Sequence, residues 1–414
     1  MQKENLFSIF CFLLAFPFLS VLGNNITFYI FLLLLLHSGR YLSFRSNGRG
    51  YFLIFFVIII ISTLFSSFID IPRHPGLLSV IKSSVKYFYW VLIPIYLISY
   101  SKKINMLKLS KYIFLGSNFL ILGFYLSHSS SPIDIIDNYS LIVIDLNFNY
   151  GRNPFVFNLL AVIPINYYYL FKSKTKISNI VIYTFFILII MLLTNGRAGF
   201  LILLIELLFI YSILNINFSK YLYLILIPAL IISISSVEIA EEISDNIAET
   251  IQPISPRISE LIRGEGEAGN LDIDKSWLVR QLMIDKALEI TKKHPLTGIG
   301  PNNFSFYDAD MIYLRNYPRL FGYNARFYNS LSAHNSYIKL ISEVGLIGFL
   351  VFIIIIYRPL NYFLRKIRNG SVSVDDIPYI SLVGISIHFF VFSALAGAIS
   401  WFVIGLSWAL YNSR

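Results

Sequence analysis

The chain has 414 residues, of which 56% are hydrophobic, 17% aromatic and only 14% charged, and its formal net charge is +10. Soluble domains average about 25% charged residues, so this composition excludes a water-soluble protein, and the abundance of apolar residues excludes a disordered one. The single cysteine, Cys11, lies in an apolar run, which excludes a disulfide framework and a thiolate metal site.

Continuous apolar runs predict helices that cross a membrane, because a helix needs about 20 apolar residues to span the hydrocarbon. We therefore predict an all-α integral membrane protein with about 12 transmembrane helices. The first run could instead be a signal peptide, but no convincing cleavage site precedes Gly23, so we favour a retained span. The predicted spans are roughly 5–22, 25–39, 51–69, 80–99, 109–127, 154–171, 179–195, 198–215, 219–237, 336–357, 377–393 and 395–411.

The spans divide the chain into three parts. Residues 1–237 hold transmembrane helices 1–9, residues 238–335 form a large, partly helical loop, and residues 336–414 hold transmembrane helices 10–12. Most of the acidic residues of the chain fall in the 238–335 loop, so we expect that loop to face water.

Basic residues gather in one alternate set of short loops, which predicts that these loops are cytoplasmic. Both termini are then cytoplasmic, and the 238–335 loop lies on the outer side of the membrane. The basic surplus thus marks topology, and we expect no nucleic-acid partner. The residues concerned are Arg40, Arg45, Arg49, Lys102, Lys103, Lys108, Lys111, Lys172, Lys174, Lys176, Arg358, Arg365, Lys366 and Arg368.

Within the external loop, the stretch 276–293 has the apolar spacing of a helix, with Ser276 as a candidate cap. The prolines and glycines of the stretch 295–301 should end it. The stretch 304–328 that follows is aromatic and basic. Such a surface suits sugars and the membrane interface equally well.

Three residues are candidates for chemistry. His334 lies where the external loop re-enters the membrane, and an unperturbed imidazole titrates near pH 6.5. Arg197 lies in a turn between two spans, where an arginine at membrane depth is costly. Arg280 lies on the external helix. Below His334, Gly345 and Gly348 fall on one stripe of the predicted helix and should let a second helix approach.

Two further signals are weaker. Asp308 and Asp310 form an Asp-x-Asp pair of a kind that can bind a metal ion, but two acids in a solvated loop are common. Glu206 lies inside a span, where acids are rare and usually functional or paired. Lys82 or Lys86 is a possible partner for it.

Together, these features resemble the O-antigen ligase and O-antigen polymerase family of bacterial envelope enzymes. The family pattern is His-Asn followed, after nine residues, by Gly-x-x-Gly. An arginine turn follows a span, and a loop arginine precedes a His-Pro-Leu-x-Gly-x-Gly stretch by some fifteen residues. The matching positions are His334, Asn335, Gly345 and Gly348; Arg197 in the turn 193–197; and Arg280 with the stretch 294–300.

The resemblance implies a multi-span glycosyltransferase of the GT-C type in the bacterial inner (cytoplasmic) membrane, with its site at the periplasmic face and a role in lipopolysaccharide biosynthesis. The donor would be an oligosaccharide on undecaprenyl diphosphate. The acceptor would be another lipid-linked glycan or the lipid A core. Such enzymes are thought to invert the anomeric carbon without a metal ion, so we expect no cofactor. Membrane lipids and a chain-length regulator are possible partners.

On this basis we assign roles. Arg197 and Arg280 would hold the donor diphosphate, since one unit-charge contact at 4 Å is worth about 4 kcal/mol at an effective dielectric near 20, before desolvation. His334 would take the proton of the acceptor hydroxyl. A nearby diphosphate raises the pKa of a histidine, so the arginines must offset this effect. Possible supporting residues are Arg152, Asn335, Tyr337 and Lys86.

Several functions remain open. We favour a polymerase, because the His-Pro-Leu-Thr-Gly-Ile-Gly stretch at 294–300 is well formed. An O-antigen ligase that transfers polysaccharide to lipid A core is the alternative. A lipid-linked glycan flippase is the rival from another class, although the large loop between two spans does not suit symmetric alternating access.

Overall fold

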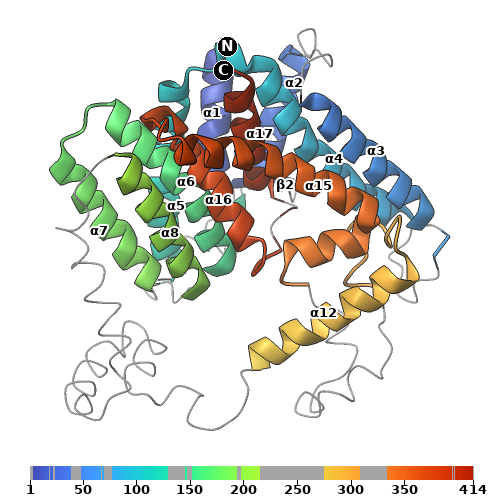
Figure 1. The fold of residues 1–414 in the computed structure, drawn as a ribbon. Coiled ribbons are helices and arrows are strands. Elements are labelled where there is room, and N and C mark those ends of the chain that lie inside the picture. The colour runs from blue at the N-terminus through green and yellow to red at the C-terminus, as the bar shows by residue number, and fades with distance from the viewer. Residues whose placement is uncertain are drawn as a thin grey trace, which may run out of the picture.

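The fold was analysed in a computed structural model. It describes residues 3–17, 19–21, 24–38, 48–66, 68–69, 77–128, 145–146, 152–193, 197–214, 275–307, 333–393, 395 and 397–413. This part of the chain is mostly helical (Figure 1). The predicted span 219–237 and most of the predicted periplasmic loop lie outside the described residues.

Each predicted span except 219–237 coincides with a helix. The ends agree within about five residues, except that the first helix ends at Ala15 and not near 22, and the tenth continues to Arg368 and not to 357. The external stretch 276–293 is also helical, as predicted. The helices are α1 Lys3–Ala15, α2 Ile26–Ser38, α3 Arg49–Ser66, α4 Leu77–Tyr100, α5 Met106–His128, α6 Arg152–Lys172, α7 Ile177–Leu193, α8 Arg197–Ile213, α12 Lys275–Lys293, α15 Ser336–Arg368, α16 Pro378–His388 and α17 Ala398–Asn412, with short 3-10 turns η2 Ser101–Lys103 and η6 Val374–Asp376.

Three of the described helices, α3, α6 and α15, are long and apolar enough to cross a membrane by length and composition. Their mean hydropathies are 2.1, 1.4 and 2.6, and five shorter apolar helices accompany them. These findings are consistent with a membrane protein. The number of twelve spans stays a prediction.

One detail differs from the all-helical prediction. The first apolar run is helical only to Ala15, and β1 (Leu19–Val21) then pairs antiparallel with β2 (Asn24–Asn25) and with β3 (Asp145–Leu146). The sheet order is β2-β1-β3. Pro17 explains the early end of the helix, because its ring removes an N–H donor and disfavours helical backbone at the preceding residue.

Two large apolar clusters and one small one hold the helices together. The first lies around α4 and α17, which approach closely at Gly405, where an added Cβ would lie 2.6 Å from the Cα of Pro94. The second joins α6, α7 and α8. The third is small and packs α12 and the turn after it against the start of α15.

Helix α15 is broken at Gly345, whose φ of 72° and ψ of −179° are not helical. Figure 1 shows α15 as two orange pieces that run in different directions. We call residues 336–344 the outer half and residues 346–368 the inner half. The apolar pattern of the sequence predicted a continuous helix here, and this prediction is wrong at Gly345. Apolar spacing does not reveal that a glycine adopts a non-helical φ.

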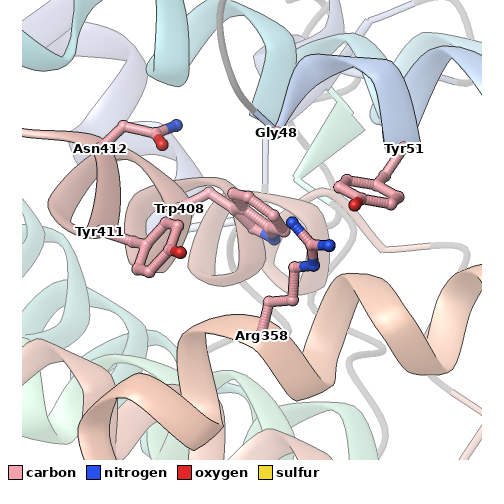
Figure 2. A pocket seen from close by; sticks show the side chains of 6 residues that line it. All are labelled: Gly48, Tyr51, Arg358, Trp408, Tyr411 and Asn412. Atoms are coloured by element: carbon pink, nitrogen blue, oxygen red, sulfur yellow. The ribbon is translucent and has the colours of Figure 1, made fainter.

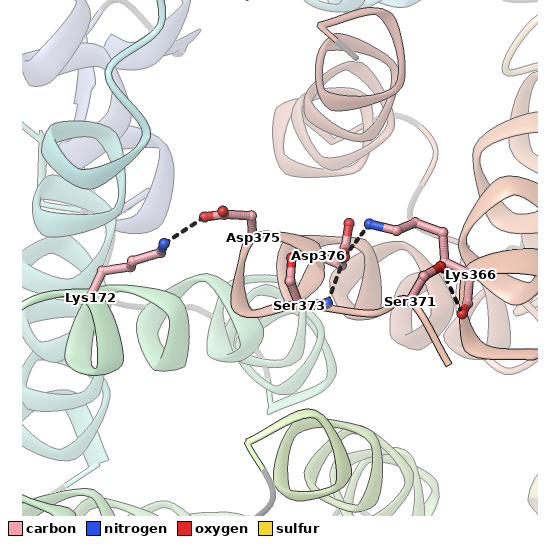
Figure 3. Close-up of polar contacts among 6 residues, drawn as sticks. All are labelled: Lys172, Lys366, Ser371, Ser373, Asp375 and Asp376. Carbon is pink, nitrogen blue, oxygen red and sulfur yellow. Dashed lines mark hydrogen bonds and ion pairs between the residues drawn. The ribbon is translucent and has the colours of Figure 1, made fainter. Parts of the chain in front are cut away.

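Basic residues gather at the end of the bundle where the inner half finishes. Lys172, at the end of α6, lies 2.9 Å from Asp375, and Lys366 of α15 bonds Asp376 (Figure 3). α1 begins and α17 ends at one end of the bundle (Figure 1). His334 precedes the opposite end of α15. The orientation of these ends in a membrane stays a prediction.

Candidate functional site

The loop that follows α12 closes the break in α15. The backbone N–H of Ile299 donates to Ser342 O over 3.0 Å, and the N–H of Gly300 donates to Glu343 O over 2.8 Å. The N–H of Leu346 in turn donates to the carbonyl of Pro295, also over 2.8 Å. Buried backbone groups must be paired, and here the loop replaces partners that the helix loses at its break.

Three glycines make this approach possible. A Cβ on Gly345 would lie 2.1 Å from Leu296 O, and one on Gly298, whose φ is 64°, would lie 2.4 Å from the carbonyl carbon of Glu343. A Cβ on Gly300 would meet Ser66 of α3 at 2.5 Å. The two glycine-containing motifs of the sequence are therefore the two sides of one contact. The partner that Gly345 admits is this loop, and not the second helix that the sequence predicted.

Gly348 fits the original prediction better. A Cβ there would lie 3.1 Å from Ile58 of α3, so this glycine does permit a neighbouring helix to approach. The hydroxyl of Ser62, also on α3, donates to Glu343 O over 2.7 Å. Helix α3 thus supports the break in α15 from the side.

His334 lies at the start of the outer half in an unusual backbone conformation. Its φ is 49°, which is uncommon for a residue other than glycine, and such residues cluster at functional sites. Asn335 caps the helix, because its side-chain oxygen accepts from Tyr337 N at 2.9 Å and Ile338 N at 3.1 Å. The N–H of Ser336 donates to Phe389 O at 2.7 Å. These bonds fix the position of His334.

Arg280 and His334 are brought together. Burial lowers the pKa of the half-buried His334 below its ordinary value, and the positive charge of the nearby Arg280 lowers it further. The lowered pKa favours the neutral imidazole, which is the form that can accept a proton. Arg280 itself is exposed on α12, so its charged end is open to a ligand.

The apolar cluster of α12 explains how the two residues meet. Leu282, Met283 and Ile290 of α12 pack with Phe304 and with Ala333, the residue next to His334. Because α12 runs directly into the loop that binds the break, the position of Arg280 and that of the outer half are set by the same contacts.

Arg197 and Arg152 begin two helices at the end of the bundle where His334 lies. A Cβ on Gly199, two residues after Arg197, would lie 2.2 Å from Val156 of α6, so α6 and α8 start side by side. Near the start of α6, the ring of Phe157 stacks at 6.0 Å from that of Phe389. Phe389 in turn accepts the bond from Ser336 described above.

The structure does not describe the side chains of Arg197, Arg152 or Lys86, whose backbones lie in α8, α6 and α4. Their contact with a substrate stays a prediction. Tyr337 donates its hydroxyl to Ser386 O at 2.9 Å, so its visible contact is structural. Asp308 and Asp310 lie outside the described residues.

Glu206 is fully buried against Gly384 of α16, where a Cβ would lie 1.8 Å from its Oε1. Neither carboxylate oxygen of Glu206 has a hydrogen-bond partner among the described residues. The side chains of Lys82 and Lys86, its predicted partners, are not among those described.

Sequence analysis missed Lys286, a buried cation near this site. Its side chain is 1% exposed and lies 4.8 Å from the centre of the Phe304 ring. A signal was present, because Leu282, Lys286 and Ile290 share one helical stripe with a spacing of four. The cation–π contact helps hold the turn after α12 in place.

Comparison with curated proteins gives no match. Residues 182–353 match the family model described as O-antigen ligase. This segment contains Arg197, Arg280, the 294–300 loop, His334 and the break at Gly345. This match supports the resemblance of the sequence to the family of O-antigen ligases and polymerases.

Proposed function

We propose that this protein transfers a glycan from undecaprenyl diphosphate to a carbohydrate acceptor at the periplasmic face of the bacterial inner membrane, and that it is an O-antigen polymerase. The family supports an O-antigen ligase or polymerase type of function. The observation that carries the assignment to this site is the placement of Arg280 beside a half-buried His334 of lowered pKa.

In the proposed reaction, neutral His334 accepts the proton of the acceptor hydroxyl. The hydroxyl oxygen attacks the anomeric carbon and forms the new glycosidic bond, while the bond from that carbon to the diphosphate breaks. Undecaprenyl diphosphate leaves with the electron pair. Attack from the side opposite the leaving group inverts the anomeric carbon.

Arg280 and Arg197 would stabilise the negative charge that grows on the departing diphosphate. A guanidinium offers paired donors to phosphate oxygens and stays protonated at neutral pH. This charge stabilisation requires no metal ion. The lowered pKa of His334 supports the base role, because the charge of Arg280 opposes the rise that a bound diphosphate would cause.

A ligase that uses lipid A core as acceptor is the second candidate, and the description of the matching family favours it. Deletion of the gene separates the two. Single repeats on lipid A core in the deletion strain would indicate a missing polymerase, whereas long chains left on undecaprenyl diphosphate would indicate a missing ligase.

A flippase is distinguished with the purified protein in liposomes that contain lipid-linked donor. Formation of longer glycans without transbilayer movement of the donor is the result we expect. Movement without glycan joining would refute the enzyme assignment. In the same assay, His334→Ala should abolish joining, while a folded Arg280→Ala protein with near-normal turnover would remove Arg280 from the site.

A further inference from the structure

A pocket of about 420 Å³ lies far from His334, between the start of α3, the inner half of α15 and the end of α17 (Figure 2). Arg358 lies 13 residues after the break at Gly345, about 20 Å along the inner half at helical rise. None of the residues assigned to the proposed reaction lines this pocket. It is lined by Gly48, Tyr51, Arg358, Trp408, Tyr411 and Asn412.

The pocket is cationic. The guanidinium of Arg358 lies 4.4 Å from the centre of the Tyr51 ring, which holds it in place over an aromatic face. Neither Arg358 nor Arg49 forms an ion pair with a carboxylate among the residues that the structure describes. Arg49 follows Gly48 at the rim, is 5% exposed, and has two guanidinium nitrogens without a hydrogen-bond partner.

Trp408 has no indole N–H available for a ligand. Its indole N–H already donates to Ile355 O at 2.8 Å, so it offers the pocket an apolar wall. Gly48 lies against this ring, since a Cβ there would be 2.4 Å from its Cζ3. Among the residues described as lining the pocket, Arg358 supplies a guanidinium that no carboxylate pairs with.

Two exposed apolar side chains lie one helical turn away from residues that line the pocket. Ile354 is one turn before Arg358 on α15 and is 39% exposed, and Ile54 is one turn after Tyr51 on α3 and is 51% exposed. Each of these side chains lies one helical turn from a residue that lines the pocket. A charged group at the pocket would thus have exposed apolar side chains within one turn of it.

We propose that this pocket binds the phosphate headgroup of an anionic membrane lipid whose acyl chain lies along Ile54 and Ile354. A guanidinium held by an aromatic ring binds phosphate oxygens through paired donors. The apolar side chains beneath it select a lipid over a free phosphate ion. This site is independent of the proposed glycosyl transfer, because it uses none of the residues of that reaction.

The test uses the purified full-length protein in detergent, with phosphatidylglycerol or phosphatidylcholine added, and native mass spectrometry to count retained lipids. We expect the wild type to retain phosphatidylglycerol and not phosphatidylcholine. Arg358→Gln should weaken retention about tenfold or more, as expected for the loss of a charge-assisted hydrogen bond. Arg368→Gln, which removes the same charge from the same helix outside the pocket, should retain the lipid as the wild type does.

Tyr51→Leu provides a second variant, which leaves the charge in place but removes the ring that orients it, and it should also weaken retention. Thermal unfolding checks that each variant is folded. Equal retention by wild type and Arg358→Gln would overturn the proposal, as would failure of the wild type to discriminate between the two lipids. Displacement of phosphatidylglycerol by millimolar inorganic phosphate would show a free-phosphate site and overturn the lipid assignment.

Discussion

Replacement of Gly345 by alanine tests whether the break in α15 positions the catalytic residues. The backbone there has φ 72° and ψ −179°, a region that is essentially restricted to glycine and costs other residues about 1–3 kcal/mol. The new Cβ would also lie 2.1 Å from Leu296 O and 2.3 Å from its carbonyl carbon. These are backbone atoms, so the loop itself must move.

Movement of the loop endangers the bonds that close the break, each worth about 0.5–1.5 kcal/mol net. They join Ile299 to Ser342, Gly300 to Glu343 and Leu346 to Pro295. We therefore expect Gly345→Ala to destabilise the loop by about 3 kcal/mol or more once strain and lost bonds are combined. Since the loop also positions α12, Arg280 should move away from His334.

Hydrogen–deuterium exchange followed by mass spectrometry measures this effect on the loop, and glycan joining per folded molecule measures it on activity. We expect faster exchange at 295–300 and a loss of turnover. Gly370→Ala is the matched control, because Gly370 also has a positive φ, 62°, but no atom lies within 4 Å of its added Cβ. Wild-type exchange and turnover in Gly345→Ala would refute the reasoning.

Three further predictions follow from the same contacts. Activity should fall as the pH drops below the lowered pKa of His334, because the protonated imidazole cannot accept a proton. The charge of Arg280 lowers that pKa, so Arg280→Gln should move the acidic limb of the pH–rate profile to higher pH. An unmoved acidic limb would contradict the interaction between Arg280 and His334. Lys366→Met leaves the fully buried Asp376 without this cation and should lower the free energy of unfolding by about 3 kcal/mol, measured as a lower midpoint of thermal unfolding. An unchanged midpoint would show that the pair does not stabilise the fold. Glycan joining should persist in excess EDTA, whereas a loss that Mg²⁺ or Mn²⁺ restores would refute the metal-independent mechanism.

Periodic patterns in the sequence predicted the helices well, because they depend on local spacing. The stretch 276–293 was recognised as a helix ended by Pro295 and the glycines after it, and α12 ends at Lys293. The start of α15 after His334 was also predicted. Local patterns were less informative at Pro17, where the chain turns into a small sheet whose third strand, β3, comes from a distant part of the sequence.

The candidate site shows where prediction from sequence ends. The residue types at His334 and Arg280 indicated a base and a phosphate ligand, but only packing could show that one lies near the other. The pocket at Arg358 could not be predicted from the sequence, since its walls come from three helices that are distant in sequence. The sequence assigned that arginine simply to a basic loop.

The sequence by itself determined that this is a largely apolar, helical membrane protein, because hydropathy and helical period are properties of neighbouring residues. It also indicated a resemblance to O-antigen ligases and polymerases, which the family match over residues 182–353 supports, since the glycine, histidine and arginine motifs are short and ordered. The tertiary structure decided why the glycine motifs occur together. One loop supplies the hydrogen bonds that a broken helix lacks, and this contact depends on residues some forty-five positions apart, such as Gly300 and Glu343, meeting in space.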